Sequence, residues 1–173
     1  MVARVTSLEP CKHQESVEVM FHQLKLARRL FPANFIKAVG VAPARGVLHG
    51  PVLLSREVRL DGLSRQVRHI FYEADARIAS KQKVFSNPAY VKHAERVDRI
   101  AKLIAKRMEE AGVIVNTNPA NVWFTEKGKP VFFDILRIDL RKASARLGRK
   151  AMQDSIHFLA EHQGKGQGET WAK

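Results

Sequence analysis

The chain has 173 residues, of which 45% are hydrophobic and 27% are charged. This balance is that of an ordinary globular protein and excludes a disordered, collagen-like or coiled-coil chain. Thirty Lys and Arg residues against 17 Asp and Glu residues leave a formal net charge of +13, which attracts nucleic acid, phosphorylated ligands, acidic proteins or membrane surfaces. The single cysteine, Cys11, excludes an internal disulfide and a cysteine-rich metal site.

Hydropathy indicates a protein without a membrane span. No apolar run is long enough for a transmembrane helix, and the first residues lack the apolar core of a signal peptide. We therefore expect a cytoplasmic protein, of unknown oligomeric state. Residues 1–162 contain no repeat or linker and should form one domain, and the Gly-rich residues 163–173 should form a flexible tail.

The first half of the chain predicts helices separated by two short strands. Residues 1–12 show no regular pattern. Apolar side chains at helical spacing predict a helix over residues 11–31. The Val-, Leu-, Gly- and Pro-rich stretch that follows predicts strands at residues 35–41 and 47–54, joined by a turn. A polar segment then leads to a helix from about Ser64 to Ala79.

The second half predicts helices around one hairpin. An amphipathic pattern predicts a helix over residues 90–111, with Gly112 as its C-cap. The apolar triplet Val113–Val115 follows as a short strand. A hairpin pairs residues 122–124 with residues 131–134, and a last helix is expected at residues 144–160.

Two polar residues flank the predicted hairpin. Asn121 precedes its first strand, and Asp134 ends its second strand. Strand pairing would bring the two residues close together. Carboxylate and amide oxygens suit Mg²⁺, which keeps several waters and takes substrate phosphates as further ligands. The histidines show no comparable metal-ligand spacing. The interpretation without a metal is that Asn116, Asn118 and Asn121 are turn residues and that Asp134 is a helix cap or surface acid.

Residues 112–134 resemble the catalytic segment of the protein-kinase-like superfamily. There, a helix leads to an Asp, four further residues and an Asn, and a hairpin then reaches a second Asp that binds metal. Asn121 matches the metal-binding Asn, and Asp134 matches the metal-binding Asp at the same spacing. The runs 118–122 and 128–134 are also similar to the "pro-x-asn-ile" and "gly-x-pro-val-x-x-asp" patterns of small-molecule kinases.

The segment departs from the family at three places. The position of the catalytic Asp holds Asn116, Ile114 and Val115 replace the preceding His-Arg, and Asp134 is not followed by Phe-Gly. An amide has no lone pair basic enough to accept a proton near neutral pH. Phosphoryl transfer depends mostly on positioning and charge neutralisation, so turnover can survive this loss. A similar loss occurs in the small bacterial kinase-like proteins of the PhoP regulatory network, which the segment also resembles.

The resemblance implies an α+β, protein-kinase-like fold that is mostly the helical large lobe. Residues 11–58 would form a reduced small lobe and hinge, and residues 59–162 the large lobe with its short hairpin. Neither a Gly-rich phosphate loop nor a strand with the usual Lys precedes Cys11. The small lobe is therefore either cut short or completed by another chain.

The same resemblance implies ATP and Mg²⁺ as ligands. Glu15 or Glu18 would be the acid that pairs with the nucleotide-binding Lys, and the hinge around Glu57 would meet adenine. Asn121 and Asp134 would hold the metal. Asn116 would orient the acceptor hydroxyl by hydrogen bonding without removing its proton.

The last third of the chain carries a basic cluster in which Asp139 is the only acid. Its members are Arg137, Arg141, Lys142, Arg146, Arg149 and Lys150. On the expected helix the last three share one face. More positive surface is expected from Lys92, Arg96, Arg99, Lys102, Lys106 and Arg107. The cluster is either a solvated helix face or a phosphate-binding patch for nucleic acid or another polyanion.

The sequence therefore leaves two functions open. The first is a kinase-like protein that binds ATP and Mg²⁺ and, if it is an active transferase, phosphorylates an unknown acceptor. The alternative is a catalytically inactive, pseudokinase-like basic adaptor that binds nucleic acid or an acidic protein through the cluster from Arg137 to Lys150.

Overall fold

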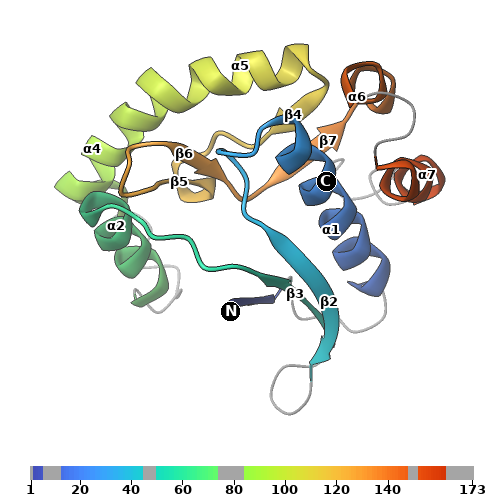
Figure 1. Cartoon of the computed structure of the whole chain (residues 1–173). Coiled ribbons are helices and arrows are strands. Elements are labelled where there is room, and N and C mark those ends of the chain that lie inside the picture. The colour runs from blue at the N-terminus through green and yellow to red at the C-terminus, as the bar shows by residue number, and fades with distance from the viewer. Residues whose placement is uncertain (1, 6–12, 45–49, 74–83, 148–151, 163–173) are drawn as a thin grey trace, which may run out of the picture.

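A computed structural model describes residues 2–5, 13–44, 50–73, 84–147 and 152–162. Helices and small antiparallel sheets alternate along these residues, which confirms the α+β class (Figure 1). The elements are β1 (Val2–Val5), α1 (His13–Leu30), β2 (Ala38–Ala44), β3 (Gly50–Ser55), α2 (Gly62–Glu73), α4 (Pro88–Arg96), the π-helical turn η2 (Val97–Ala101), α5 (Lys102–Glu110), β4 (Val113–Val115), the 3₁₀ turn η3 (Pro119–Asn121), β5 (Val122–Phe124), β6 (Pro130–Phe132), β7 (Ile135–Ile138), α6 (Leu140–Leu147) and α7 (Gln153–His162).

The N-terminal part of the fold is a three-stranded antiparallel sheet in the order β1-β3-β2. Helix α1 connects β1 to β2 and packs against both β2 and β3. Strand β1 shows that the expectation of an irregular N-terminus was wrong for residues 2–5, where Val2 pairs with Ser55 and Val5 with Val52. Four residues are too few to display a strand period, and their conformation comes from pairing with β3.

The long predicted helix is present as α4, η2 and α5, which follow one another without a break from Pro88 to Glu110 and arch over the hairpin (Figure 1). Asn87 caps its start, because the Asn87 side chain accepts a hydrogen bond from the backbone N–H of Ala89 at 2.9 Å, and Pro88 occupies the first turn. Gly112, with φ of +88°, ends it as predicted.

The predicted hairpin is confirmed as β5 and β6, with Val122 opposite Phe132. Strand β4 is also confirmed, but its partner β7 was not predicted. The prediction of a single last helix was wrong, because α6 ends at Leu147 and α7 begins at Gln153. Met152, just before α7, has a φ of +63°, which an uninterrupted helix does not contain.

The remaining predicted elements agree within a few residues where they are described. Helix α1 lies within the expected 11–31, and the strand expected at 35–41 is shifted to β2. The second strand is found as β3, and α2 begins two residues before the expected Ser64. Parts of these predictions, and the tail at 163–173, lie outside the described residues. Among the described helices, none is both long and apolar enough to cross a membrane.

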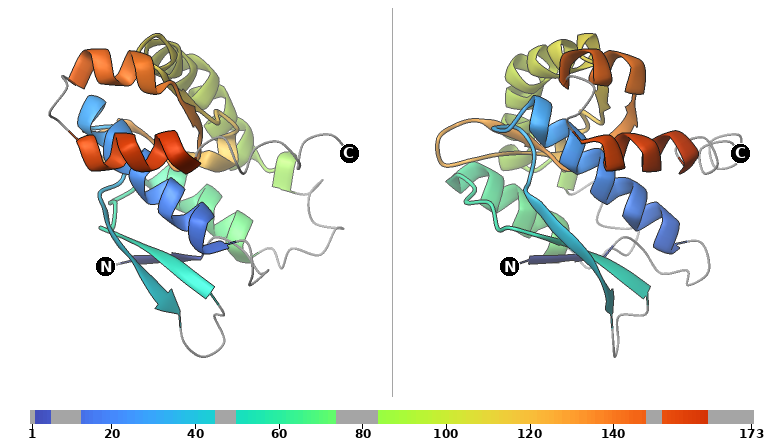
Figure 2. Two further views of the ribbon diagram at one scale, coloured as in Figure 1. Left: turned by 90° about the vertical axis from the view of Figure 1, so that its right-hand side faces the viewer. Right: turned by 45° about the vertical axis from the view of Figure 1, so that its right-hand side comes forward.

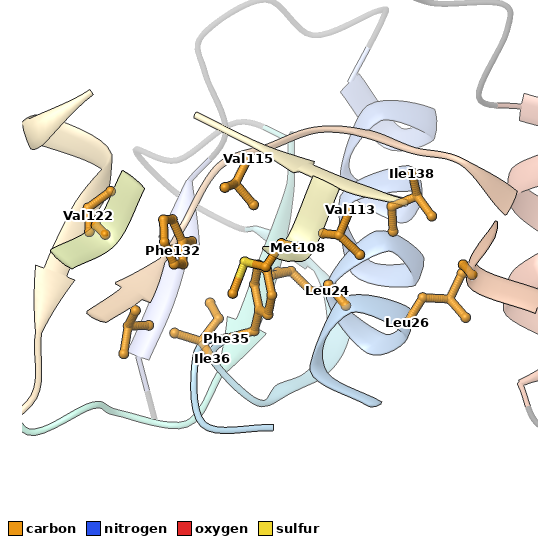
Figure 3. Packing of buried hydrophobic residues seen from close by; sticks show 14 of the residues in the cluster. Leu24, Leu26, Phe35, Ile36, Met108, Val113, Val115, Val122, Phe132 and Ile138 are labelled. Atoms are coloured by element: carbon orange, nitrogen blue, oxygen red, sulfur yellow. The ribbon is translucent and has the colours of Figure 1, made fainter. Parts of the chain in front are cut away.

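One hydrophobic core joins the sheet, the long helix and the hairpin. Leu24 of α1, Phe35, Met108 of α5, Val113 of β4 and Phe132 of β6 meet there, and all five are at most 2% exposed (Figure 3). The hairpin strand β6 therefore contributes an aromatic residue, Phe132, to this core. Burying side chains of this size stabilises a fold by about 1.5–3 kcal/mol each.

Helix α7 covers the outer side of α1 (Figure 2). His22 Nδ1 lies 2.9 Å from Ser155 Oγ, and the His22 ring stacks on Phe158 with centroids 4.3 Å apart. Leu159 of α7 is fully buried in the main core. The C-terminal helix therefore fixes α1 against the rest of the molecule.

Hydrogen bonds also tie the segment after α1 to the hairpin. The Asn34 side chain donates to the Pro130 carbonyl at 2.9 Å, and Phe132 N–H donates to the Asn34 carbonyl at 2.9 Å. Phe35 forms an isolated parallel bridge with Phe132. The N-terminal sheet is thus attached to the strand that leads to Asp134.

Candidate functional site

Asn116 and Asp134 are held together by two hydrogen bonds. Asn116 Nδ2 donates to Asp134 Oδ2 at 2.9 Å, and the Asn116 backbone N–H donates to the Asp134 carbonyl at 3.0 Å. Asn116 directly follows β4, and Asp134 lies between β6 and β7. Because β4 pairs with β7, both residues sit where two short sheets meet. The half-buried Asp134 carboxylate is therefore fixed by its neighbours and still reachable by solvent.

The loop from Asn116 to Asn121 is held by its own asparagines. Asn116 Oδ1 accepts from Asn118 N–H at 3.0 Å, and Asn118 Oδ1 accepts from Ala120 N–H at 3.0 Å. These contacts are the side-chain-to-backbone turns that Asn favours. Asn116 and Asn118 thus act as turn residues, and Asn116 also orients Asp134. Both polar atoms of the Asn116 side chain are engaged in this way.

Asn121 lies across the hairpin from the residue that precedes Asp134. The Asn121 carbonyl accepts a hydrogen bond from Phe133 N–H at 3.2 Å, one step beyond the Val122–Phe132 pair. The Asn121 side chain is half-buried. The hairpin therefore brings Asn121 and Asp134 to the same end, as the sequence predicted.

A buried histidine supports the loop from behind. His93 of α4 is fully buried, and its Nε2 lies 2.9 Å from the Val122 carbonyl and 3.1 Å from the Pro119 carbonyl, on either side of Asn121. Its Nδ1 is buried and has no hydrogen-bond partner in the described structure. Sequence reasoning did not single out His93, although its spacing of four residues from the buried Val97 could have placed it on the inner face.

A charged pair beside His93 joins α2 to the long helix. Arg96 contacts the Asp61 carboxylate and lies over the Phe124 ring, 3.9 Å from its centroid. Asp61 Oδ1 also accepts from Ser64 N–H at 2.8 Å, which caps α2. Although burial raises the pKa of Asp61, these hydrogen bonds from Ser64 and Arg96 outweigh burial, and the pKa is lowered. Arg96 was expected on the positive surface, and this was wrong because it is engaged here.

The buried histidine predicts acid-sensitive stability. Burial lowers the pKa of His93, and this outweighs the opposing effects of the Val122 and Pro119 carbonyls and of Asp61. The unfolded state then binds more protons than the folded state as the pH falls through about 6.5, so stability decreases in that direction. Protonation would also bury an N–H at Nδ1 without an acceptor. We expect a lower urea midpoint at pH 5.5 than at pH 7.5.

Two variants separate this effect from other titrations. The His93→Gln variant should be less stable at both pH values but should lose part of the difference between them. His157→Gln removes a histidine whose side chain is 76% exposed and is the matched control for the change of residue type. An unaltered pH difference in His93→Gln would mean that His93 does not titrate in this range. His22 also has a lowered pKa, through burial and Lys25, and accounts for a residual slope.

The other predicted site residues lie apart from the Asn116–Asp134 pair. Glu18 is half-buried on α1, and Glu57 is exposed between β3 and α2. Within the described residues, no hydrogen bond or ion pair joins either acid to Asn116 or Asp134. Glu15 belongs to the first turn of α1.

The basic cluster is described only in part. Its four described members are all exposed, in β7 and α6: Arg137, Arg141, Lys142 and Arg146. Asp139 caps α6, because its Oδ1 accepts from the N–H groups of Arg141 and Lys142 at 3.1 Å. Arg149 and Lys150 lie outside the described residues, so the face that they were expected to share with Arg146 is not seen.

The oxygen ligands at the hairpin fit a hard divalent cation. A carboxylate and an amide oxygen, from Asp134 and Asn121, are of the ligand type that Mg²⁺ takes together with waters and phosphate oxygens. Among the described residues, no group of three or more His, Cys, Asp or Glu side chains gathers as a metal cluster.

No protein-family model, curated protein or solved structure matches the chain. The functional interpretation therefore rests on the geometry of the Asn116–Asn121 loop and Asp134.

Proposed function

We propose that the chain is a small kinase-like protein that binds ATP with Mg²⁺. Asp134 and Asn121 would hold the cation at the end of the hairpin. The observation that carries this proposal is the double hydrogen bond between Asn116 and Asp134. These two hydrogen bonds hold the Asp134 carboxylate in a fixed place, next to the hairpin strand that begins after Asn121. A metal-binding site for nucleotide phosphates requires ligands that are fixed in this way.

The arrangement of the first half supports a kinase-like fold. In the proposal, β1, α1, β2 and β3 form the reduced small lobe, and residues 56–61 form the hinge that leads into α2. Glu57 lies on this hinge and is exposed, so this segment is accessible to a ligand. Glu18 on α1 would be the acid that pairs with a nucleotide-binding Lys. The long helix, β4, the hairpin and the last helices form the large lobe.

The residues of the site favour positioning over proton transfer. Bound Mg²⁺ would neutralise charge on the nucleotide phosphates. Asn116 cannot act as a base, and the structure engages its Nδ2 with Asp134 and its Oδ1 with Asn118. Its role in the proposal is to orient the Asp134 carboxylate. An acceptor hydroxyl would therefore lose its proton to water, and turnover would be slow or absent.

A thermal-shift titration with ATP in excess Mg²⁺ tests the proposal. Specific binding raises stability by mass action, by about 2.7 kcal/mol at 100 times the Kd. A protein with a net charge of +13 also attracts any polyanion, so ATP with EDTA and Mg²⁺ with tripolyphosphate are the necessary controls. We expect stabilisation that requires both Mg²⁺ and the adenosine moiety. Equal stabilisation by tripolyphosphate, or none at millimolar ATP, would refute nucleotide binding.

A basic adaptor is the second candidate, favoured by the exposed cations of β7 and α6. None of Arg137, Arg141, Lys142 and Arg146 forms an ion pair with an acid in the described structure, and Asp139 is occupied as a cap. Cations that lack acidic partners remain available to phosphate groups.

The adaptor predicts salt-dependent binding of nucleic acid. Affinity for a random duplex should fall steeply with salt, with a slope of about −0.9 per phosphate neutralised. Replacing Arg137, Arg141 and Arg146 together by Gln should weaken binding. It should also make the salt slope less steep, by up to about 0.9 for each of the three phosphate contacts that are lost. The matched control replaces Lys92, Arg99 and Arg107, which carry the same charge on the long helix. Equal losses in both triple variants would show attraction by net charge alone.

A further inference from the structure

A pocket of about 240 Å³ opens between α5 and β4, beside the loop that carries Asn116. Its apolar part comes from Ala105, Ile114 and Val115. Its polar part is formed by Lys102, Lys106, Glu109 and Thr117. A pocket of this size is suited to a small metabolite and is slightly below the range that holds drug-sized ligands.

Cations dominate one side of this pocket. Lys102 and Lys106 are four residues apart on α5 and therefore lie one above the other on the same face. Lys102 contacts Asp98 at 2.7 Å, but both side chains are more than half exposed, and a pair of this kind contributes little and exchanges readily. No ion pair or hydrogen bond engages Lys106 in the described structure.

A third cation, Arg137, lies on the neighbouring strand β7, outside the pocket lining. Arg137 of β7 is directly opposite Ile114 in the β4–β7 pair, and paired residues of antiparallel strands project on the same side of the sheet. Since Ile114 lines the pocket, the exposed Arg137 lies on the pocket side of this sheet. The two lysines that line the pocket favour an anionic group such as a phosphate monoester.

Two further groups restrict the ligand. The Glu109 carboxylate would repel a bare phosphate but accept a hydrogen bond from a hydroxyl group, and Thr117 can donate to or accept from one. Ala105 and Ile114 offer a surface for a short carbon chain. The lining therefore matches a molecule with a phosphate at one end and hydroxyl groups along its carbon chain.

We propose that this pocket binds a small phosphorylated alcohol, with its phosphate at Lys102 and Lys106 and its hydroxyls at Glu109 and Thr117. Thr117 directly follows Asn116, whose side chain holds Asp134, so the ligand is bound next to the candidate metal site. A role of this ligand as phosphate acceptor rests on the proposed function. The binding itself does not.

Titration of the whole chain with glycerol 3-phosphate, followed by NMR at the Thr117 amide and the Ile114 methyl group, tests this inference. We expect saturable shifts at both positions, weaker binding of inorganic phosphate and none of glycerol. The Lys102→Gln/Lys106→Gln variant should raise the Kd for glycerol 3-phosphate at least about tenfold. The Lys92→Gln/Arg107→Gln variant removes the same charge from the long helix, outside the pocket lining, and should change the Kd less than about twofold.

Further measurements separate the possible failures. Glu109→Gln should strengthen binding of inorganic phosphate and reduce the preference for glycerol 3-phosphate, because the amide no longer repels phosphate but still accepts a hydrogen bond. These titrations contain neither ATP nor Mg²⁺, so the pocket is tested even if the chain does not bind ATP. Equal weakening in both lysine and control variants, or the absence of saturable shifts at Thr117 and Ile114, would overturn the inference and leave only non-specific attraction of anions.

Discussion

The Asp134→Asn variant should lose the Mg²⁺-dependent part of ATP binding and remain folded. The amide has nearly the same shape as the carboxylate, and its oxygen can still accept the hydrogen bond from Asn116 Nδ2. What is lost is the negative charge that a hard cation requires. Mutation of groups that only hydrogen-bond to metal ligands already lowers metal affinity by about 10–100-fold. Loss of a charged ligand should lower it at least as much. Calorimetric titration with ATP at saturating Mg²⁺ measures the difference.

Two further variants show whether such a loss is specific. Asp98→Asn removes one negative charge from an exposed position on the long helix and should bind Mg²⁺–ATP as the wild type does. Asn116→Ala keeps the carboxylate but removes its hydrogen-bond donor, and we expect a loss intermediate between Asp98→Asn and Asp134→Asn. Unchanged Mg²⁺–ATP binding in Asp134→Asn would show that any nucleotide site of this chain lies elsewhere.

Elements with strong local signals could be predicted from the sequence. The long helix has an extended apolar face and is framed by Asn87-Pro88 and Gly112, which are a cap, a first-turn proline and a C-terminal glycine. The hairpin has two apolar runs around a turn with Gly128, whose φ is +72°. These two elements place Asn121 and Asp134, so the positions of both residues could be predicted from local sequence signals.

Features formed by contacts between distant residues could not be predicted. Strands β1 and β7 are four residues each and owe their conformation to pairing with β3 and β4. Arg96 was expected to be a solvated helix residue. Its contact with Asp61, which lies 35 positions earlier, leaves no local signal in the sequence. The same holds for the contact of Asn116 with Asp134, since the sequence suggested Asn121 as the nearest partner.

The second large effect is expected at Gly112, where the long helix meets α6. Its φ of +88° is a conformation that a residue with a side chain rarely adopts. A Cβ at Gly112 would lie 2.8 Å from the Asp139 carbonyl oxygen and 2.8 Å from Lys142 Cβ. The Asp139 N–H donates to the Gly112 carbonyl at 2.7 Å, so the two segments cannot separate without losing this bond. Backbone strain and overpacking together should cost the Gly112→Ala variant about 2–5 kcal/mol of unfolding free energy.

Urea unfolding of Gly112→Ala and Gly62→Ala checks this cost. Gly62→Ala is the control, because a Cβ at the exposed Gly62 would meet nothing within 4 Å. Gly62→Ala should be neutral or stabilise the chain by up to about 1 kcal/mol, since alanine is the better helix residue. Gly112 also precedes β4, and Asn116 directly follows β4, so a shift of this junction moves the residue that holds Asp134. Gly112→Ala should therefore weaken Mg²⁺–ATP binding even at temperatures where it is fully folded. A variant as stable as the wild type would mean that α6 can move away from the helix end, and the contact between Gly112 and Asp139 would then not position the site.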